Sequence, residues 1–173
     1  MIILDTNVLS ELMRPKPSLC VSGWIAKQSA TELFTTSITE AEIFFGIELL
    51  AQGKRREGLL RAAEDMFAED LGGRVFGFES DAARLFSTIA AHRRALGKPI
   101  SHADAQIAAI TRARGAMLAT RNISDFDDCG FDLINPWDGY AEASAMIVRT
   151  TPKSFPNSTS TMPERTWSEF LAS

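Results

Sequence analysis

The sequence of 173 residues contains only two cysteines, Cys20 and Cys129, which lie far apart and outside any CxxC motif. This scarcity excludes a disulfide framework and gives no sign of a zinc ribbon. No run of apolar residues approaches the roughly 18 that a membrane span requires. Asp5 and Glu11 interrupt the apolar start of the chain, and no basic segment precedes it. We therefore expect no secretory leader and a reducing, cytoplasmic location.

The chain also lacks an excess of basic residues, with a net charge of −4 and an isoelectric point of about 5.2. Nothing in its overall charge attracts nucleic acid, so a polyanionic partner must be held by a local patch or through metal ions. Apolar material is plentiful, because 45% of the residues are hydrophobic and 11 of them are Phe. This composition suffices for one sizeable core in a single domain followed at most by a tail.

Short apolar runs alternate with helical patterns along the chain. Strands are predicted at residues 2–4, 32–39, 74–78, 116–120 and 131–137. Helices are predicted near Val8 and Val21 and at residues 40–53, 54–73, 80–97 and 101–115, with Gly53 and Gly97 as stops. This alternation predicts a parallel α/β sheet with helices on both faces.

Carboxylates recur where the predicted strands end and the helices begin. They are Asp5, Glu40, Glu42, Asp104 and the group Asn122, Asp125, Asp127 and Asp128, in which Asn122 is neutral. Each position has a local explanation as a helix cap. Asp5 or Thr6 caps the first helix, while Thr39 with Glu42 and Ser101 with Asp104 fit the spacing of a capping box. Taken singly, each acid is more simply explained as a cap than as a ligand.

Taken together, these acids favour a metal site. In a parallel sheet, groups at strand ends converge at the edge where ligands bind. Three or four carboxylates there repel one another and raise one another's pKa values, unless a cation neutralises them. Oxygen donors without Cys or paired His suit Mg²⁺ or Mn²⁺ rather than Zn²⁺. A carboxylate-held Mg²⁺ supports phosphoryl chemistry, because it activates a water molecule and stabilises the leaving oxygen.

The segments MIILDTNVLSEL, TTSITEAEIFFGI, SHADAQIAAITRARG and LATRNISDFDDCGFDLINPW follow the order of the motifs of PIN-domain ribonucleases. The chain resembles this family over residues 1–140, and more narrowly the VapC toxins of bacterial toxin–antitoxin pairs, in their FitB-like branch. The resemblance implies a three-layer α/β/α sandwich with a central, mostly parallel sheet. It also implies Mg²⁺-dependent cleavage of RNA, often tRNA, a homodimer, and inhibition by a small DNA-binding antitoxin.

The resemblance makes Asp5, Glu42 and Asp104 the acidic core that binds the metal. Asp125 is expected to act as an outer, water-bridged contributor to catalysis, and Asn122 stands where many PIN domains have Asp. Glu40 is assigned to solvent or capping. The side chains expected to orient the carboxylates, each of which fits equally well as a turn residue, are Thr6, Asn7, Ser37, Thr120 and Asn122.

RNA is expected to contact local groups of basic residues. Arg121 is the first candidate for a phosphate contact, followed by Arg112 and by Lys54, Arg55 and Arg56. The group His92–Arg94 is interpreted as a solvated helix face. No aromatic residues alternate with the basic ones in the manner of an RNA-recognition motif, so stacking of that type is not indicated.

Two other functions stay open at this point. A haloacid-dehalogenase-like phosphatase also begins with a strand that ends in Asp, but it needs a second Asp where this chain has Asn7. It also needs a late catalytic Lys, for which the chain offers no convincing candidate. The third reading is a catalytically silent protein that only binds a partner in a regulatory complex.

Apolar residues beyond the needs of a thin sheet predict a two-fold dimer. They are Phe44, Phe45, Leu85, Phe86 and Ile89, and an exposed patch of this kind marks an interface.

From Thr150 the composition shifts to Ser, Thr and Pro. We predict a C-terminal extension over residues 141–173, made of a linker and a short amphipathic helix carrying Trp167, Phe170 and Leu171.

Overall fold

A six-stranded sheet forms the centre of the computed structural model, which describes residues 1–138 and 147–148. The strand order is β3-β2-β1-β4-β5-β6. The strands are β1 (Ile2–Leu4), β2 (Leu33–Thr36), β3 (Val75–Phe76), β4 (Met117–Ala119), β5 (Leu133–Ile134) and β6 (Ile147–Val148). Neighbours pair in parallel from β3 to β5, and β6 alone runs antiparallel, against β5. The predicted parallel α/β sheet is confirmed.

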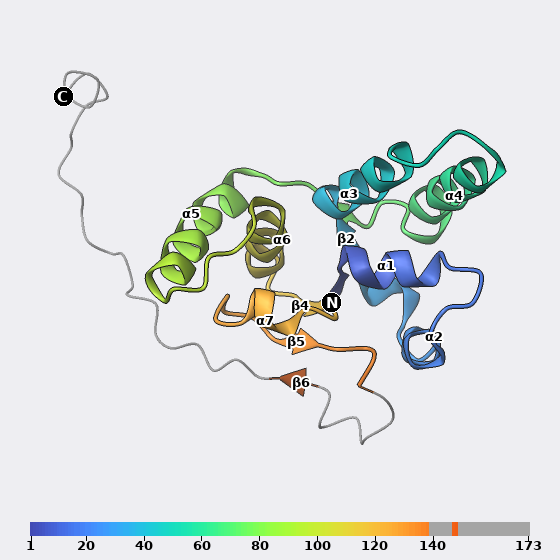
Figure 1. Ribbon diagram of the computed structural model, residues 1–173. Helices are drawn as coiled ribbons and strands as arrows, with labels where there is room; N and C mark the ends of the chain where they lie inside the picture. Colours follow the sequence, from blue (N-terminus) through green and yellow to red (C-terminus); the bar gives the residue numbers. More distant parts are fainter. Residues whose placement is uncertain (139–146, 149–173) are drawn as a thin grey trace, which may run out of the picture.

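Seven α-helices cover the two faces of this sheet within the described residues (Figure 1). They are α1 (Thr6–Leu12), α2 (Leu19–Ile25), α3 (Ser37–Glu48), α4 (Lys54–Asp65), α5 (Ser80–Ala95), α6 (His102–Ala113) and α7 (Ile123–Phe126). Two shorter helical turns complete the described structure, a 3₁₀ turn at Ala30–Glu32 and a π-helical turn at Met66–Asp70.

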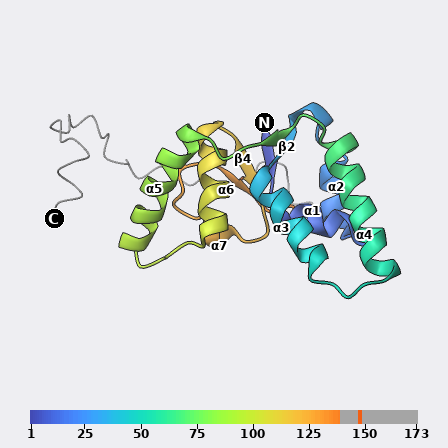
Figure 2. The same cartoon turned by 90° about the horizontal axis from the view of Figure 1, so that it is seen from above.

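The alternation of side chains along β1 builds two separate cores. Ile2 and Leu4 face a core shared with α1 to α4, whereas Ile3 faces a second core shared with α5, α6 and α7. Both sides of β1 are buried, which explains why its sequence is apolar throughout. Figure 2 shows the two groups of helices on opposite sides of the sheet. The three-layer α/β/α sandwich is therefore present.

Several predicted boundaries were wrong for local reasons. The second strand ends at Thr36 rather than residue 39, because the Thr36 side chain accepts the N–H of Thr39 (3.1 Å) and caps α3. Thr39 is thus buried inside the first turn and does not form the capping box predicted with Glu42. The charged helix predicted over 54–73 is α-helical only to Asp65. Strand β6 was not predicted, and it lies beyond the expected domain boundary at residue 140.

The apolar stripe predicted to form a dimer patch belongs mostly to the core. Ile89 is fully buried, and Leu85 and Phe86 pack around the second core. Phe44 packs on Phe67, with ring centroids 5.7 Å apart. Of the predicted patch, Phe45 alone is exposed, at 65% of its surface.

Two expectations concern membranes and the chain end. Across residues 1–138 and 147–148, no helix has the length and apolar character needed to cross a bilayer. The predicted amphipathic helix around Trp167 lies outside the described residues.

The topology reverses direction at β1. The chain builds β2 and β3 on one side of this strand and then returns to add β4 and β5 on the other. The backbone N–H of Asp5 donates to the carbonyl of Ala119 (3.0 Å), so β1 and β4 stay paired up to their ends. Ligands of open α/β sheets bind at such a reversal, outside the carboxyl ends of the strands.

Candidate active site

Asp5 follows β1 directly and caps α1, as its local sequence predicts. Its side chain is 4% exposed. Oδ1 accepts the backbone N–H of Thr6 (2.7 Å), while Oδ2 accepts the Asn7 amide (2.5 Å) and the Thr120 hydroxyl (2.7 Å). The backbone cap uses one oxygen only, and the second oxygen binds the Asn7 side chain of α1 and the Thr120 hydroxyl just past β4.

Asn7 and Thr120 tie the end of β4 to Asp5. The Asn7 amide also donates to the Thr120 oxygen (3.0 Å), and its own oxygen accepts the backbone N–H of Arg121 (3.0 Å). Thr120 in turn accepts the backbone N–H of Asn122 (3.0 Å). Both residues, which the sequence suggested as carboxylate-orienting groups, therefore hydrogen-bond the carboxylate of Asp5.

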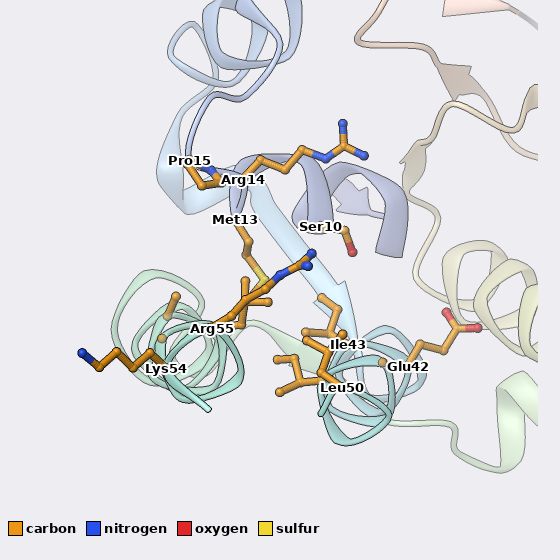
Figure 3. Close-up of a pocket in the computed structure, with 14 residues that line it drawn as sticks. Ser10, Met13, Arg14, Pro15, Glu42, Ile43, Leu50, Lys54 and Arg55 are labelled. Carbon is orange, nitrogen blue, oxygen red and sulfur yellow. The ribbon is translucent and has the colours of Figure 1, made fainter. Parts of the chain in front are cut away.

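Glu42 approaches from the second turn of α3. The Thr6 hydroxyl donates to its Oε2 (2.5 Å), so Thr6 bridges two acids, with its N–H on Asp5 and its hydroxyl on Glu42. Figure 3 shows the Glu42 carboxylate pointing away from Lys54 and Arg55. Ser37 begins α3 and, within the described part of the chain, forms no hydrogen bond with these acids.

Asp104 lies in the first turn of α6. The Ser101 hydroxyl accepts the backbone N–H of Asp104 (3.0 Å) and donates to its Oδ2 (2.6 Å). The Ser101 cap predicted from the sequence is therefore present. It engages one carboxylate oxygen of Asp104 and leaves the other for a different partner.

The three acids act on one another electrostatically. Burial raises the pKa of Asp5 from 3.8 to about 6, against the opposing effect of its hydrogen bonds from Thr120 and Thr6. The nearby carboxylates of Asp104 and Glu42 are smaller causes that act in the same direction as burial and contribute to this value. The sequence therefore gathers negative charge around a buried carboxylate.

A hard divalent cation fits the chemistry of this donor set. Asp5, Glu42 and Asp104 offer carboxylate oxygens only, the ligands that suit Mg²⁺ and Mn²⁺. In the described residues, no three acidic, His or Cys side chains converge closely enough to form a finished metal site. Glu42 and Asp104 instead hold the hydroxyls of Thr6 and Ser101, each through a single oxygen.

The fourth acidic position falls on the short helix α7. Asn122 precedes this helix and Asp125 lies within it, and both side chains are exposed. The backbone N–H of Asp125 donates to the Asn122 carbonyl (3.1 Å), and Asn122 is bound to Thr120. Asn122 is therefore joined directly to the network around Asp5, whereas Asp125 is joined to it through Asn122.

The basic residues predicted to bind RNA are spread over the molecule. Arg121 is adjacent to the network, and its guanidinium lies 5.4 Å from the centre of the Trp137 ring. Arg112 lies in the last turn of α6. Eight residues separate it from Asp104, which places it about 12 Å away along the helix. Arg56 forms an ion pair with Glu48.

Lys54 and Arg55 border an apolar groove rather than the acids. The groove has a volume of about 590 Å³ and lies between α1, α3 and α4. Its lining residues are Ser10, Met13, Arg14, Pro15, Glu42, Ile43, Gly46, Ile47, Leu50, Lys54, Arg55, Gly58, Leu59 and Ala62. Glu42 is the one member of the acidic group that also borders this groove.

The sequence reasoning missed the role of the residues beside α7. Arg93 is 3% exposed, so the solvated face predicted for the run His92–Arg94 is wrong at this position. Its spacing of four residues from the buried Ile89 was the available signal. Asp127 and Asp128, grouped by sequence with the acids, pair with Lys98 at 3.6 Å and 3.2 Å.

Comparisons with known proteins identify the family of this fold. A model of the PIN domain family matches residues 2–131. VapC ribonuclease Y4jK of Sinorhizobium fredii is 42% identical over 138 residues, which cover 80% of this chain and 99% of that protein. Toxin FitB of Neisseria gonorrhoeae is 33% identical over 137 residues, covering 79% of this chain and 99% of FitB. The solved structure of FitAB bound to an IR36 DNA fragment superposes with a TM-score of 0.75 at 33% identity, over 79% of this chain and 96% of that one.

The buried charge of Asp5 predicts an unusual pH dependence of stability. A group whose pKa is raised on folding stabilises the fold while protonated, and this contribution is lost as the pH rises from its ordinary value to its folded value. For Asp5 the window runs from 3.8 to about 6. In EDTA, the free energy of unfolding of Asp5→Asn relative to wild type should therefore increase by about 2 kcal/mol between pH 4 and pH 7.

Urea denaturation at a series of pH values measures this difference. Any constant offset from hydrogen bonds that Asn cannot accept does not change with pH, so the slope alone is decisive. As a control, the carboxyl carbon of Asp5 should titrate at lower pH in Asp104→Asn and in Glu42→Gln, because each removes a neighbouring negative charge. A difference that stays flat with pH would contradict the assignment.

Proposed function

Because the chain belongs to the PIN-domain family, in the group of VapC ribonucleases and FitB toxins, we propose that it hydrolyses RNA phosphodiester bonds as the toxin of a type II toxin–antitoxin system. The observation that carries this proposal is the buried carboxylate of Asp5, whose pKa the carboxylates of Asp104 and Glu42 raise further. An uncompensated cluster of this kind at the reversal of an α/β sheet suits a metal-dependent nuclease.

Asp5, Glu42 and Asp104 are the proposed metal ligands. Held by these carboxylates, Mg²⁺ or Mn²⁺ would supply activation of an attacking water and stabilisation of the leaving oxygen. The protein's own contribution is orientation. The Thr6 N–H, the Asn7 amide and the Thr120 hydroxyl hold Asp5 in one position, and the Thr6 hydroxyl holds Glu42.

Two residues next to α7 complete the proposed site. Asp125 is exposed and is proposed as an outer acid that acts through water, while Asn122 contributes a neutral polar group. Ser37 begins α3 and is proposed only as a more distant polar neighbour of Glu42.

Arg121 is the best placed of the proposed RNA contacts. Its backbone is bound to Asn7, and its guanidinium is held near the Trp137 ring. With a net charge of −4, the protein needs such a local cation to receive a phosphate beside the acids. The proposed contacts of Arg112, Lys54, Arg55 and Arg56 concern more distant parts of an RNA.

The phosphatase alternative is not favoured. Its second Asp would stand at position 7, where the Asn7 amide donates to Asp5 and to Thr120 and its oxygen accepts an N–H. A carboxylate there could not donate either bond. The silent-partner alternative becomes an outcome of the cleavage experiment below.

A small DNA-binding antitoxin is the proposed partner. The solved FitAB structure is a toxin–antitoxin assembly on DNA and supports this choice. The apolar groove between α1, α3 and α4 offers a surface for an apolar segment of the antitoxin, and Glu42 borders it. A basic side chain of that segment could pair with the acids and neutralise them in place of the metal.

A homodimer is proposed through α3. Phe45, in the last turn of this helix, and Leu49, its C-cap, are 65% and 71% exposed and lie four residues apart. Adjacent exposed apolar side chains of this size are typical of an interface. Two copies related by a two-fold axis would cover the same patch on both chains.

The proposed activity is assigned to residues 1–140 and to the cytoplasm. All of the proposed acids precede residue 126, and the family model ends at residue 131. The extension over residues 141–173 is proposed as separable from catalysis, although it supplies β6 to the sheet. RNA as substrate, together with two free cysteines, is consistent with a reducing cytoplasm.

The nuclease proposal predicts which acids matter. With purified protein and Mg²⁺ on total RNA, wild type should create new ends that can be mapped by sequencing. Asp5→Asn, Glu42→Gln and Asp104→Asn should each reduce cleavage by more than roughly 100-fold, the upper range for loss of a mere outer partner of a metal. Glu40→Gln is the matched control, because Glu40 lies on the same helix as Glu42 and should cut as wild type.

Melting curves separate this loss from misfolding. Mg²⁺ should stabilise wild type by about 3 kcal/mol when its concentration is 100 times the dissociation constant. Asp104→Asn should gain much less from Mg²⁺ and should be at least as stable as wild type in EDTA. A wild-type protein that binds its antitoxin but cuts no RNA would favour the silent-partner reading.

The groove prediction uses two glycines that line it. Gly46 on α3 and Gly58 on α4 both line the groove, and a Cβ added at either position meets no atom within 4 Å. Gly46→Leu with Gly58→Leu should fold and cut RNA, yet resist inhibition by the antitoxin because the groove is filled. Gly46→Ala with Gly58→Ala, the matched control, should be inhibited normally and gain roughly 0.5–1 kcal/mol per site. Normal inhibition of the leucine pair in a titration assay would place the antitoxin elsewhere.

The dimer prediction concerns the exposed pair on α3. Light scattering of wild type at micromolar concentration should give twice the chain mass of 19.0 kDa. Phe45→Ser with Leu49→Ser should give the monomer mass, because the exposed apolar area is lost while the core is untouched. Leu19→Ser, at an 88% exposed position on α2, serves as control and should stay dimeric. A dimer that survives the double substitution would exclude this surface.

A further inference from the structure

Arg93 is a buried cation at the end of α5. Its guanidinium donates to three backbone carbonyls, with Nε on Lys98 (3.1 Å), Nη2 on Ser124 (3.2 Å) and Nη1 on Asp127. The first carbonyl belongs to the loop after α5, and the other two belong to α7 and the residue that follows it. One side chain therefore joins two segments that are 31 to 34 residues apart in sequence.

An arginine at this position has a desolvation cost that an apolar residue would avoid. Ile89, one turn earlier on α5, is fully buried and packs in the same core. A buried guanidinium is tolerated only when its donors are satisfied. The last carbonyls of a helix lack partners within the helix, and in α7 the Ser124 carbonyl accepts from Arg93 while the Phe126 carbonyl accepts the Cys129 N–H. The planar guanidinium of Arg93 is therefore explained by the carbonyls at α7 that it binds, and not by packing in the core.

Backbone hydrogen bonds fix the C-terminal end of α5, which carries Arg93. The N–H of Lys98 donates to the Arg93 carbonyl (2.9 Å) and the N–H of Gly97 to the Arg94 carbonyl (3.1 Å), which together form a Schellman motif. Gly97 has φ of +71°, a conformation in which glycine is favoured. The Lys98 ammonium then contacts the carboxylates of Asp127 and Asp128.

The other end of α7 belongs to the candidate active site. Thr120 donates to Asp5 and accepts the N–H of Asn122, and Asn122 accepts the N–H of Asp125. Helix α7 has only four residues, too few to hold its own orientation. It lies on the same side of the sheet as α5 and α6 (Figure 2). Phe126 packs the helix against the second core, and two polar anchors, one at Thr120 and one at Arg93, hold the backbone before and after it.

We propose that Arg93 is a positioning residue, which holds α7 so that Asn122 and, through it, Asp125 keep their places relative to Thr120 and Asp5. Its importance for catalysis rests on the proposed nuclease function, whereas its hold on α7 does not. Arg93 touches no reacting group, and it acts through the backbone of residues 124–127.

The buried thiol of Cys129 reports on this anchor. Cys129 is fully buried, and its N–H donates to the Phe126 carbonyl (3.3 Å) at the end of α7. Burial raises the pKa of its thiol to about 12, and the charge of Arg93 acts to lower it. Loss of that charge alone would therefore make the thiol less reactive. Any increase in reactivity must come from opening of the segment.

The experiment uses the full chain with Cys20→Ser, so that Cys129 is the only thiol, and dithiobis(nitrobenzoic acid) as the probe at pH 8. Arg93→Met leaves three carbonyls without their donor, and the rate of thiol modification should rise on the order of tenfold or more. Amide exchange at Asp125 should accelerate in parallel. Arg93→Lys should be intermediate, because one ammonium cannot replace the fork. Arg94→Met, its exposed neighbour, should match the parent protein.

Cleavage of total RNA gives the functional readout. Cleavage by Arg93→Met should be roughly 10- to 100-fold slower than by the parent protein, the range for outer groups that orient a metal site. If Arg93 acts through α7, the same substitution should cost much less in an Asn122→Ala, Asp125→Ala background, whereas a general structural defect would add in full. Circular dichroism of each variant checks that the fold is retained.

The outcomes separate the two proposals. A protein whose parent form cuts no RNA refutes the nuclease function, and the thiol and amide data then decide the role of Arg93 alone. If Arg93→Met matches the parent protein in the rate of thiol modification and in amide exchange at Asp125, Arg93 does not anchor α7. An opened segment with unchanged RNA cleavage, or a full additive loss in the double background, would reduce Arg93 to a structural residue.

Discussion

Asp5 carries a charge that the fold buries at the end of its central strand. Its two oxygens accept bonds from the start of α1 and from Thr120, just past the end of β4. Because β1 and β4 belong to different halves of the sheet, the same carboxylate joins those halves at the point where the chain reverses its order. The orientation of Thr120, Asn7 and the backbone of Arg121 follows from this one group.

Burial of this charge explains why the site favours a cation. The hydrogen bonds on Asp5 lower its pKa but do not offset desolvation, so the value stays near 6. The carboxylates of Asp104 and Glu42 repel the charge of Asp5 and raise its pKa, so they do not stabilise that charge. A divalent metal and a basic side chain of a partner meet the same electrostatic demand, so they compete for one position. Catalysis and inhibition would then be two ways of neutralising a single buried carboxylate.

The architecture could be predicted from sequence because it depends on short-range patterns. Apolar runs such as Ile2–Leu4 indicate strands buried on both faces, and acids placed at strand ends must meet at one edge. The end of β2 could not be predicted, because the sequence allows either Thr36 or Thr39 to cap α3. In the structure, Thr36 is the cap. Strand β6 pairs through the backbone with β5, which a sequence pattern does not encode. An apolar stripe such as the one through Ile89 has the same sequence pattern whether it packs in the core or forms an interface. The sequence alone could therefore not assign it to one or the other.

In the described chain, the surroundings of a buried charged residue distinguish a structural role from a role in the candidate site. Glu11 is 6% exposed, but it accepts the N–H of Ser18 and pairs with Arg14 (3.0 Å). Arg93 meets three carbonyls. Both charges are compensated within the fold, and both hold loops in place. Of these three buried charged residues, Asp5 is the one that lies next to groups of its own sign. Burial by itself therefore does not mark a functional residue, whereas burial without electrostatic compensation does.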